Sequence, residues 1–302
     1  MDRPAVGAVP GEREVLSEKP DGWKPDVYAR FAAERRRPFH DLLALLAPIP
    51  GGRAVDLGCG AGELTRELHR ATGAAETIGL DSSEAMLEKA RPLAGNGVRF
   101  EKGDIGAWES DAPLDLVFSN AALHWVPDHP ALLERLTRAV KPGGQLAFQV
   151  PDNFGHPAHT NAEEVAREEP FRSALDGGGE PHARNVLAPE DYATRLHRLG
   201  YAEQIVRLQI YGDRLPSRED VVAWVQGSLL SEYRRRLPGD LYPAFVERYR
   251  ERLFAAIPDE RPYFLTYRRI LVRARRDVSH DVAKASASAQ GLRVDSVDTP
   301  PT

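Results

Sequence analysis

The chain has 302 residues, of which 42% are hydrophobic and 28% charged, and its formal net charge is −5 at pH 7. This balance is typical of a globular protein with a sizeable core, and the excess of acids gives no general field for binding nucleic acid. The single cysteine, Cys59, excludes an intramolecular disulfide and a cysteine-based zinc site. The longest apolar run near the start, 42–50, is far shorter than the ~20 residues of a membrane span. Because no secretory signal pattern is present either, we expect a soluble, cytoplasmic protein.

Both ends of the chain lack hydrophobic periodicity. Residues 1–22 carry scattered proline, glycine and charged residues, and residues 276–302 are rich in serine, alanine and proline. Segments of this composition bury too little apolar surface to fold. We predict disordered tails at 1–22 and 276–302, and one folded domain over 23–275.

Between the tails, short apolar runs alternate with helical patterns. Strands are predicted at 53–57, 76–80, 98–101, 114–119 and 145–150, and helices at 63–71, 83–90 and 130–140. Ser83 is placed to cap the second of these helices. This alternation predicts an α/β fold with a parallel sheet covered on both faces.

After residue 150 the regular alternation stops. Helices are predicted near 161–169, 189–199, 217–236 and 240–256, and strands at 204–210 and 263–274. We therefore expect helical insertions at about 151–200 and 215–258. Because they precede the final strand, these insertions suit a lid over an active site.

The most distinctive segment has a strand that runs into a glycine turn and then into a helix: Val55-Asp56-Leu57-Gly58-Cys59-Gly60-Ala61-Gly62. Glycines permit positive φ and a close approach of a ligand to the backbone, and the helix N-terminus offers unpaired N–H groups. Glu63 stands where the dinucleotide fingerprint has its third glycine. Because a glutamate would repel a pyrophosphate, the loop favours a nucleotide-like ligand without phosphates over a nicotinamide cofactor.

Acidic residues end the next two predicted strands. Asp81 is placed where a carboxylate accepts both ribose hydroxyls of a nucleotide, and its alternative role is to cap the following helix. Asp104 could accept an adenine amino group while Ile105 packs on the ring, and its alternative role is in a turn. With the glycine loop, these residues predict a nucleoside site at the carboxyl ends of the strands.

The loop, these acids and the segments 115–120 and 141–144 together resemble the class I S-adenosylmethionine (SAM) methyltransferases. The resemblance implies SAM as cofactor, with S-adenosylhomocysteine (SAH) as product, and a SAM-binding core at about 53–150. It also implies a Rossmann-like sheet of seven strands whose last strand, predicted at 263–274, is antiparallel. The cofactor-binding residues that it implies are Asp56, Gly58, Gly60, Gly62, Asp81, Ser82, Asp104, Ile105, Asn120 and Trp125.

A narrower resemblance covers about residues 23–275. The chain is similar to the trans-aconitate methyltransferases in the segments YARFAAERRRP (28–38), SNAA (119–122), WVPDH (125–129), QVPDN (149–153) and AWV (223–225). In that family SAM methylates a carboxylate of a small tricarboxylic acid to give a methyl ester. The chain departs from the family at His124, where glutamine is usual, and after Trp224, where Leu-Arg-Pro is replaced by a segment containing Glu232.

Methyl transfer requires above all an acceptor held in line with the donor methyl group. A carboxylate acceptor is already deprotonated at pH 7, and arginine suits its other acidic groups. Arg35 is the main candidate for this contact, and Arg37, Arg184 and Arg261 are weaker ones. A solvated surface position is the alternative for each of them.

Two side chains after the fourth predicted strand are candidates for the reaction itself. His124 could act as a base for a hydroxyl acceptor, or orient the acceptor, and its alternative role is in packing or capping. Trp125 could face the sulfonium of SAM, or only close the end of the sheet. The loop histidines His156, His159 and His182 have no acidic partner at metal spacing, so we predict no metal.

We therefore expect a SAM-dependent O-methyltransferase that forms a methyl ester on a small carboxylic acid such as trans-aconitate. The alternative, which His124 and the changed lid favour, is an O- or N-methyltransferase of a hydroxylated or amine-bearing secondary metabolite. The segment 119–122 lacks the Pro-Pro-aromatic motif of base methyltransferases, and a non-catalytic SAM-binding protein would keep the glycine loop without turnover. We expect a small-molecule partner, and neither nucleic acid nor a membrane.

Overall fold

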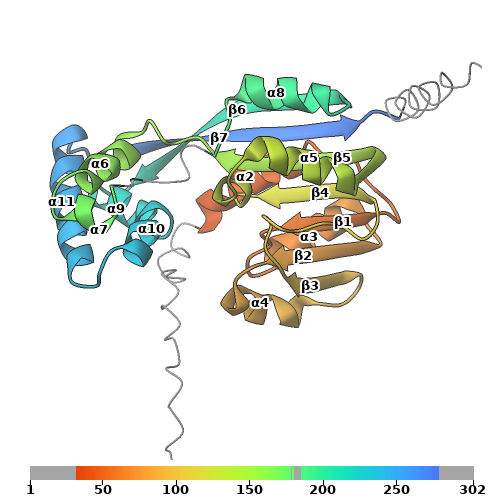
Figure 1. Ribbon diagram of the computed structural model, residues 1–302, viewed down its shortest axis with the longest axis horizontal. Helices are drawn as coiled ribbons and strands as arrows, with labels where there is room; N and C mark the ends of the chain where they lie inside the picture. The colour runs from red at the N-terminus through yellow and green to blue at the C-terminus, as the bar shows by residue number, and fades with distance from the viewer. Residues whose placement is uncertain (1–31, 178, 180–184, 279–302) are drawn as a thin grey trace, which may run out of the picture.

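The computed structural model describes residues 32–177, 179 and 185–278 (Figure 1). The predicted tail at 1–22 and the positions 279–302 of the other tail lie outside the described residues, as do His182 and Arg184. Within the described part, every helix falls short of the length and apolar composition that crossing a bilayer would require.

A seven-stranded sheet forms the centre of the molecule, with the strand order β3-β2-β1-β4-β5-β7-β6. The strands are β1 (Arg53–Leu57), β2 (Glu76–Asp81), β3 (Val98–Lys102), β4 (Leu114–Asn120), β5 (Val140–Pro151), β6 (Tyr201–Leu215) and β7 (Tyr263–Arg276). Strands β1 to β5 pair in parallel, and β7 pairs antiparallel with both β5 and β6. The predicted sheet of seven strands with an antiparallel last strand is confirmed.

Alternate residues of the strands divide the core between the two faces of the sheet. One face, the α2 face, packs Leu116, Phe118, Ala147 and Leu271 against side chains of α2 (Ala32–Leu43) and α3 (Glu63–Thr72). The opposite face packs Val117, Leu146, Phe148 and Ile270 against α5 (His129–Ala139) and α8 (Pro189–Arg198). Helix α4 (Glu84–Ala90) contacts β2 and β3, and the Ser83 side chain caps it, as predicted, by accepting from the backbone N–H of Met86.

The remaining helices form a second group, the helical cluster, at the end of the long β6–β7 ribbon (Figure 1). Its members are α6 (Pro157–Ala166), α7 (Phe171–Ala174), α9 (Glu219–Gln226), α10 (Leu229–Arg236) and α11 (Leu241–Ala256). The ribbon contributes Tyr211 and Tyr267 to the apolar core of this cluster. The segment 151–200 is therefore divided between the two groups of helices. Helices α6 and α7 belong to the helical cluster, whereas α8 packs against the sheet through its buried residues Tyr192 and Leu196.

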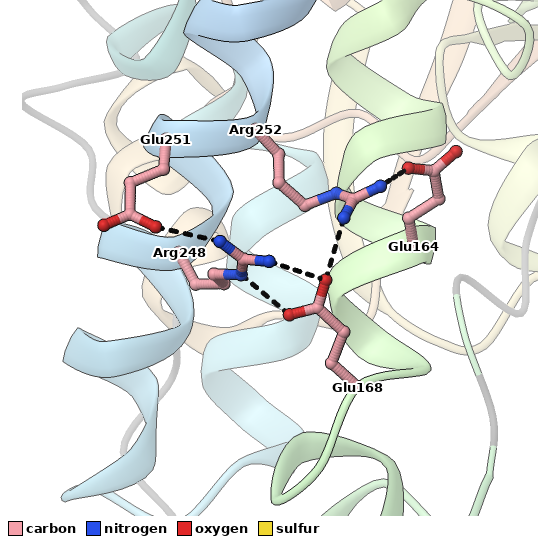
Figure 2. Close-up of polar contacts among 5 residues, drawn as sticks. All are labelled: Glu164, Glu168, Arg248, Glu251 and Arg252. Atoms are coloured by element: carbon pink, nitrogen blue, oxygen red, sulfur yellow. Dashed lines mark hydrogen bonds and ion pairs between the residues drawn. The ribbon is translucent and has the colours of Figure 1, made fainter.

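A network of charged side chains joins α6 and the residues after it to α11 (Figure 2). Glu168 accepts from Arg248 Nε at 2.7 Å and from Arg252 Nη1 at 2.9 Å. Arg252 also pairs with Glu164, and Arg248 with Glu251. Hydrogen bonds from Arg248 hold the pKa of Glu168 below its usual value. These partly exposed side chains link the two helices beside the apolar core of the cluster.

Several predicted elements have different bounds, and the strand predicted at 204–210 extends over Tyr201–Leu215. Helix α6 begins at Pro157 instead of 161, because proline suits the first turn and His156 caps it. The predicted helix 217–236 is divided into α9 and α10 at Gly227. Strand β5 begins at Val140, well before 145, because Val140 pairs with Leu114 ahead of a register shift.

Candidate functional site

The glycine loop after β1 is tightly packed at its ends and open in its middle. Gly58, Gly60 and Gly62 all have positive φ, at 81°, 55° and 85°. A Cβ on Gly58 would lie 2.2 Å from the Cβ of Ala122, and one on Gly62 would lie 2.7 Å from Phe100. A Cβ on Gly60 would meet no heavy atom within 4 Å. A ligand therefore has access to the backbone at Gly60.

Asp81, at the end of β2, holds this loop in place. Its Oδ2 accepts from the backbone N–H of Gly60 at 2.9 Å, and its Oδ1 accepts from the backbone N–H of Ser83 at 2.9 Å. Asp81 thus joins the glycine loop to the turn before α4, while Ser83 itself caps the helix. Each carboxylate oxygen can accept a further hydrogen bond, so the ribose contact predicted for Asp81 remains compatible with this geometry.

Two side chains beneath the loop are buried. Asp56 is 3% exposed, and its Oδ2 accepts from the Thr65 hydroxyl at 2.6 Å, whereas its Oδ1 has no partner in the described structure. Burial raises the pKa of Asp56 to about 7. The Cys59 side chain is also buried, and burial raises the pKa of its thiol. Asp56 therefore anchors the loop to α3, and Cys59 stays protonated.

The other residues predicted near the nucleoside lie after β2 and β3. Asp104 is exposed, and its Oδ1 accepts from the backbone N–H of Gly106 at 2.8 Å, which is the turn role considered for it. Ile105 is partly buried, and its Cδ1 lies 3.5 Å from the position of a Cβ on Gly58. Ser82 is exposed beside Asp81. Parallel pairing of β1, β2 and β3 brings these residues to one edge of the sheet, the carboxyl edge.

The turn after β4 completes the same edge. Asn120 lies opposite Gln149 of β5, and Gln149 Nε2 donates to Asn120 Oδ1 at 2.9 Å. Ala121 has a positive φ of 54°, and its backbone N–H donates to the carbonyl oxygen of Gln149 at 3.0 Å. Gln149 is 1% exposed, and its Oε1 has no partner among the residues that the structure describes. Sequence reasoning assigned Gln149 no role, although it begins the segment QVPDN.

His124 and Trp125 follow in a short 3-10 helix, Leu123–Trp125. Their ring centroids are 4.8 Å apart, and Trp125 is 43% exposed. The carbonyl oxygen of His124 accepts from Asn185 Nδ2 at 3.0 Å, which ties this turn to the segment before α8. An aromatic pair with one exposed member therefore stands beside the carboxyl edge.

The candidate arginines have different positions. Arg35 belongs to α2, but its side chain lies outside the described residues. Arg37 Nη2 lies 2.5 Å from Asp213 Oδ1 and donates to the Tyr267 hydroxyl at 3.3 Å, so it fastens α2 to the β6–β7 ribbon. Arg261 is 68% exposed and lies 3.9 Å from Glu219, which is the surface position considered for it.

The histidines predicted not to bind metal lie after β5. His156 Nδ1 accepts from the backbone N–H of Ala158 at 3.1 Å, and burial lowers the pKa of His156. The ring of His159 packs edge-on against Phe154. Across the described ranges, no group of three or more histidine, cysteine or acidic side chains is arranged to hold a metal ion.

Comparisons with known proteins agree with this arrangement. Residues 54–144 match the family described as "Methyltransferase domain". A protein of Deinococcus radiodurans named "Trans-aconitate 2-methyltransferase" is 40% identical over 260 residues, which are 85% of this chain and 99% of that protein. A protein of Rhizobium meliloti with the same name is 37% identical over 240 residues, which are 78% of this chain and 91% of that protein.

Solved structures share the fold at low sequence identity. A proposed methyltransferase of Bacillus halodurans has a TM-score of 0.51 and 19% identity, covering 79% of this chain and 98% of that one. The YcgJ protein of Bacillus subtilis has a TM-score of 0.50 and 16% identity, covering 79% of this chain and 99% of that one. At this identity the structural likeness bears on the fold alone.

Proposed function

The chain belongs to the family of the trans-aconitate 2-methyltransferases and is a SAM-dependent methyltransferase, and we propose that it methylates a carboxylate of a small acid such as trans-aconitate. The product would be a methyl ester. The observation that carries this proposal is the 40% identity to a relative of that name over 99% of the relative's length. The proposed methyltransferase domain is 23–275, with the SAM-binding core at about 53–150.

The residues of the carboxyl edge fit SAM. The accessible backbone at Gly60 suits a ligand that approaches the loop closely, and we propose that Asp81, which accepts from Gly60, also accepts from the ribose hydroxyls. When bound, SAM supplies an electrophilic methyl group on a sulfonium. The full set of residues that we propose to hold it is Asp56, Gly58, Gly60, Gly62, Asp81, Ser82, Asp104, Ile105, Asn120 and Trp125.

For a carboxylate acceptor, the work of the protein is positioning. A carboxylate is already a nucleophile at neutral pH, so no base is required, and orientation alone supplies about 7–11 kcal/mol of the rate enhancement in favourable cases. We propose that Arg35 binds a non-reacting carboxylate of the acceptor, because its forked guanidinium suits that group. We propose that His124 orients the acceptor beside Trp125, where the family has glutamine.

The buried glutamate of the lid does not oppose an anionic acceptor. Glu232 is 6% exposed and accepts from Arg235 Nη2 at 2.8 Å and 3.0 Å. Its charge is therefore balanced by an arginine one helical turn away, within α10. This pairing removes the charge of Glu232 as an argument against a carboxylate acceptor, and the replacement of Leu-Arg-Pro stays a departure from the family.

His124 favours the alternative, a hydroxylated or amine-bearing metabolite. A hydroxyl acceptor has to lose a proton, and a histidine after β4 is a suitable base. The variant His124→Gln restores the family residue. It should retain turnover with a carboxylate acceptor, whereas complete loss of turnover would indicate a reaction that depends on a base.

The proposal is tested by the release of SAH from SAM in the presence of trans-aconitate, citrate, isocitrate and a panel of hydroxylated aromatic compounds. We expect turnover with trans-aconitate well above a blank without acceptor. If no tricarboxylate gave turnover above the blank while SAM still bound, the carboxylate proposal would be overturned in favour of the alternative.

We also propose that the partner of this chain in the cell is its small-molecule acceptor, with no nucleic acid and no membrane, and that the protein acts in the cytoplasm. The net charge of −5 supports the absence of nucleic-acid binding. Cell fractionation followed by immunodetection tests the location, and a signal in the membrane fraction would contradict it.

A further inference from the structure

Two neighbouring side-chain amides at the carboxyl edge, those of Asn120 and Gln149, have a donor and an acceptor that make no hydrogen bond to the described residues. Asn120 and Gln149 are register partners on β4 and β5, and both lie on the α2 face, in line with Phe118 and Ala147. Gln149 holds the turn after β4 twice, through its side chain to Asn120 and through its carbonyl oxygen to Ala121. Ala121 has a positive φ of 54°, a conformation that alanine rarely adopts. The position of the Asn120 amide is therefore fixed by Gln149.

The inventory of donors and acceptors shows what this pair lacks. An asparagine amide has one acceptor oxygen and two N–H donors, and the oxygen of Asn120 accepts from Gln149. No described residue accepts from its Nδ2. Gln149 is 1% exposed, yet its Oε1 receives no hydrogen bond from the described residues. Other buried atoms of the described structure also lack a partner, but this oxygen lies at the carboxyl edge, where a bound ligand would supply the donor that a buried acceptor generally has.

A free N–H donor beside a free acceptor oxygen matches an α-amino-acid group, which carries a carboxylate and an ammonium on one carbon. SAM has such a group at its methionine end. Trans-aconitate, the proposed acceptor, carries carboxylates and no hydroxyl or amine, so it offers no hydrogen-bond donor to Gln149. The pair also lies beside the glycine loop, since Ala122 contacts Gly58.

We propose that Asn120 and Gln149 bind the amino-acid end of SAM. Nδ2 of Asn120 donates to its carboxylate, and Oε1 of Gln149 accepts from its ammonium. This assignment rests on SAM as the cofactor and on no particular acceptor. It adds Gln149, a residue of β5, to the cofactor site.

Calorimetric binding of two ligands to the full chain tests the assignment. SAH has the amino-acid group, whereas 5′-methylthioadenosine has the same adenosine and thioether without it. In Asn120→Ala and Gln149→Met we expect affinity for SAH to fall about tenfold or more, because hydrogen bonds to charged groups are lost. Affinity for methylthioadenosine should stay unchanged, so the ratio of the two affinities should fall.

Gln145→Met is the matched control. Gln145 lies four residues earlier on the same strand and is 2% exposed, but its amide bonds the backbone N–H and carbonyl of Ala47. This variant should lower the thermal midpoint and leave the ratio of affinities unchanged. If Gln149→Met does not fold, Asn120→Asp serves instead, because its side chain still accepts from Gln149 while its charge repels the SAH carboxylate.

Each outcome decides the assignment. An unchanged ratio of SAH affinity to methylthioadenosine affinity in Asn120→Ala and Asn120→Asp would overturn it. If the KM for the acceptor rose in a separate turnover assay while that ratio stayed unchanged, the pair would bind an acceptor carboxylate. Asp56 Oδ1 is the rival acceptor for the ammonium, since it too is buried without a partner in the described structure. A fall of the ratio in Asp56→Asn but not in Gln149→Met would move the ammonium to Asp56 and overturn the role of Gln149. Because the calorimetric assay contains no acceptor, its result does not depend on whether the trans-aconitate proposal is correct.

Discussion

Gly58 and Ala122 meet across the carboxyl edge so closely that a Cβ on Gly58 would lie 2.2 Å from the Cβ of Ala122. This approach joins the loop after β1 to the turn after β4, the two segments from which most of the proposed SAM contacts come. The absence of a side chain at Gly58 is thus a requirement of packing as well as of its positive φ of 81°.

We expect Gly58→Ala to lower the free energy of unfolding by about 2–4 kcal/mol, because it adds a clash with Ala122 to an unfavourable φ. Urea unfolding measures the loss, and SAH binding should weaken with it. Gly60→Ala is the control, since Gly60 has a positive φ but open space around its Cα. It should cost about 1 kcal/mol. Equal losses in the two variants would contradict the role of the contact.

Replacing Asp81 with alanine should weaken SAM binding severalfold or more. The change removes the acceptor for the backbone N–H of Gly60, which orders the open part of the loop, and the proposed acceptor for ribose. Titration calorimetry with SAH measures the effect. Asp104→Ala provides a comparison at the next strand end, where the carboxylate accepts from the backbone of its own turn. Unchanged affinity in Asp81→Ala would show that the ribose contact is misplaced.

The buried carboxyl of Asp56 should make stability depend on pH. Burial raises its pKa to about 7 in the folded chain, above the value of about 3.9 expected when unfolded. The unfolded state therefore releases this proton first, and stability should fall as pH rises from about 4 to 7, by up to about 1.4 kcal/mol per pH unit. Unfolding curves of Asp56→Asn should lack this component. An identical pH profile in both chains would disprove it.

The charged network between Glu168 and α11 should stabilise the helical cluster modestly. Glu168→Gln should lower the free energy of unfolding by about 1 kcal/mol, because the side chains are partly exposed. The pKa of Glu168 is lowered in the fold, so this contribution is present at neutral pH and is lost as pH falls through that lowered pKa. Glu163→Gln, at an exposed pair with Arg167, is the control and should have less effect. A larger loss in the control would contradict the role of the network.

The sheet and its edge could be predicted from local patterns in the sequence. The strands β1, β2 and β4 are short, mainly apolar runs that end at or next to glycine, aspartate or asparagine, and such runs indicate buried parallel strands. Because parallel strands end at one edge, the glycine loop, Asp81 and Asp104 were expected to lie together, and the structure brings them there.

The contacts between distant segments could not be predicted in this way. The pairing of Gln149 with Asn120 depends on the register of β5 against β4, which no local pattern encodes. Arg37 was a candidate for the acceptor, but its neighbour Asp213 lies 176 residues away in the sequence. The division of 217–236 into two helices, by contrast, has a local signal, because it falls at Gly227 and glycine has a low helix propensity.

The position of Cys59 makes the glycine loop a natural target for chemical labelling. This residue is the only cysteine of the chain, it is 8% exposed, and burial raises the pKa of its thiol, so the reactive thiolate is scarce in the closed loop. We expect alkylating reagents to reach this buried thiol only when the loop opens, so that every modified molecule would report the same event. The rate of alkylation would therefore measure the rate of loop opening, without an engineered probe and without a signal from a second thiol.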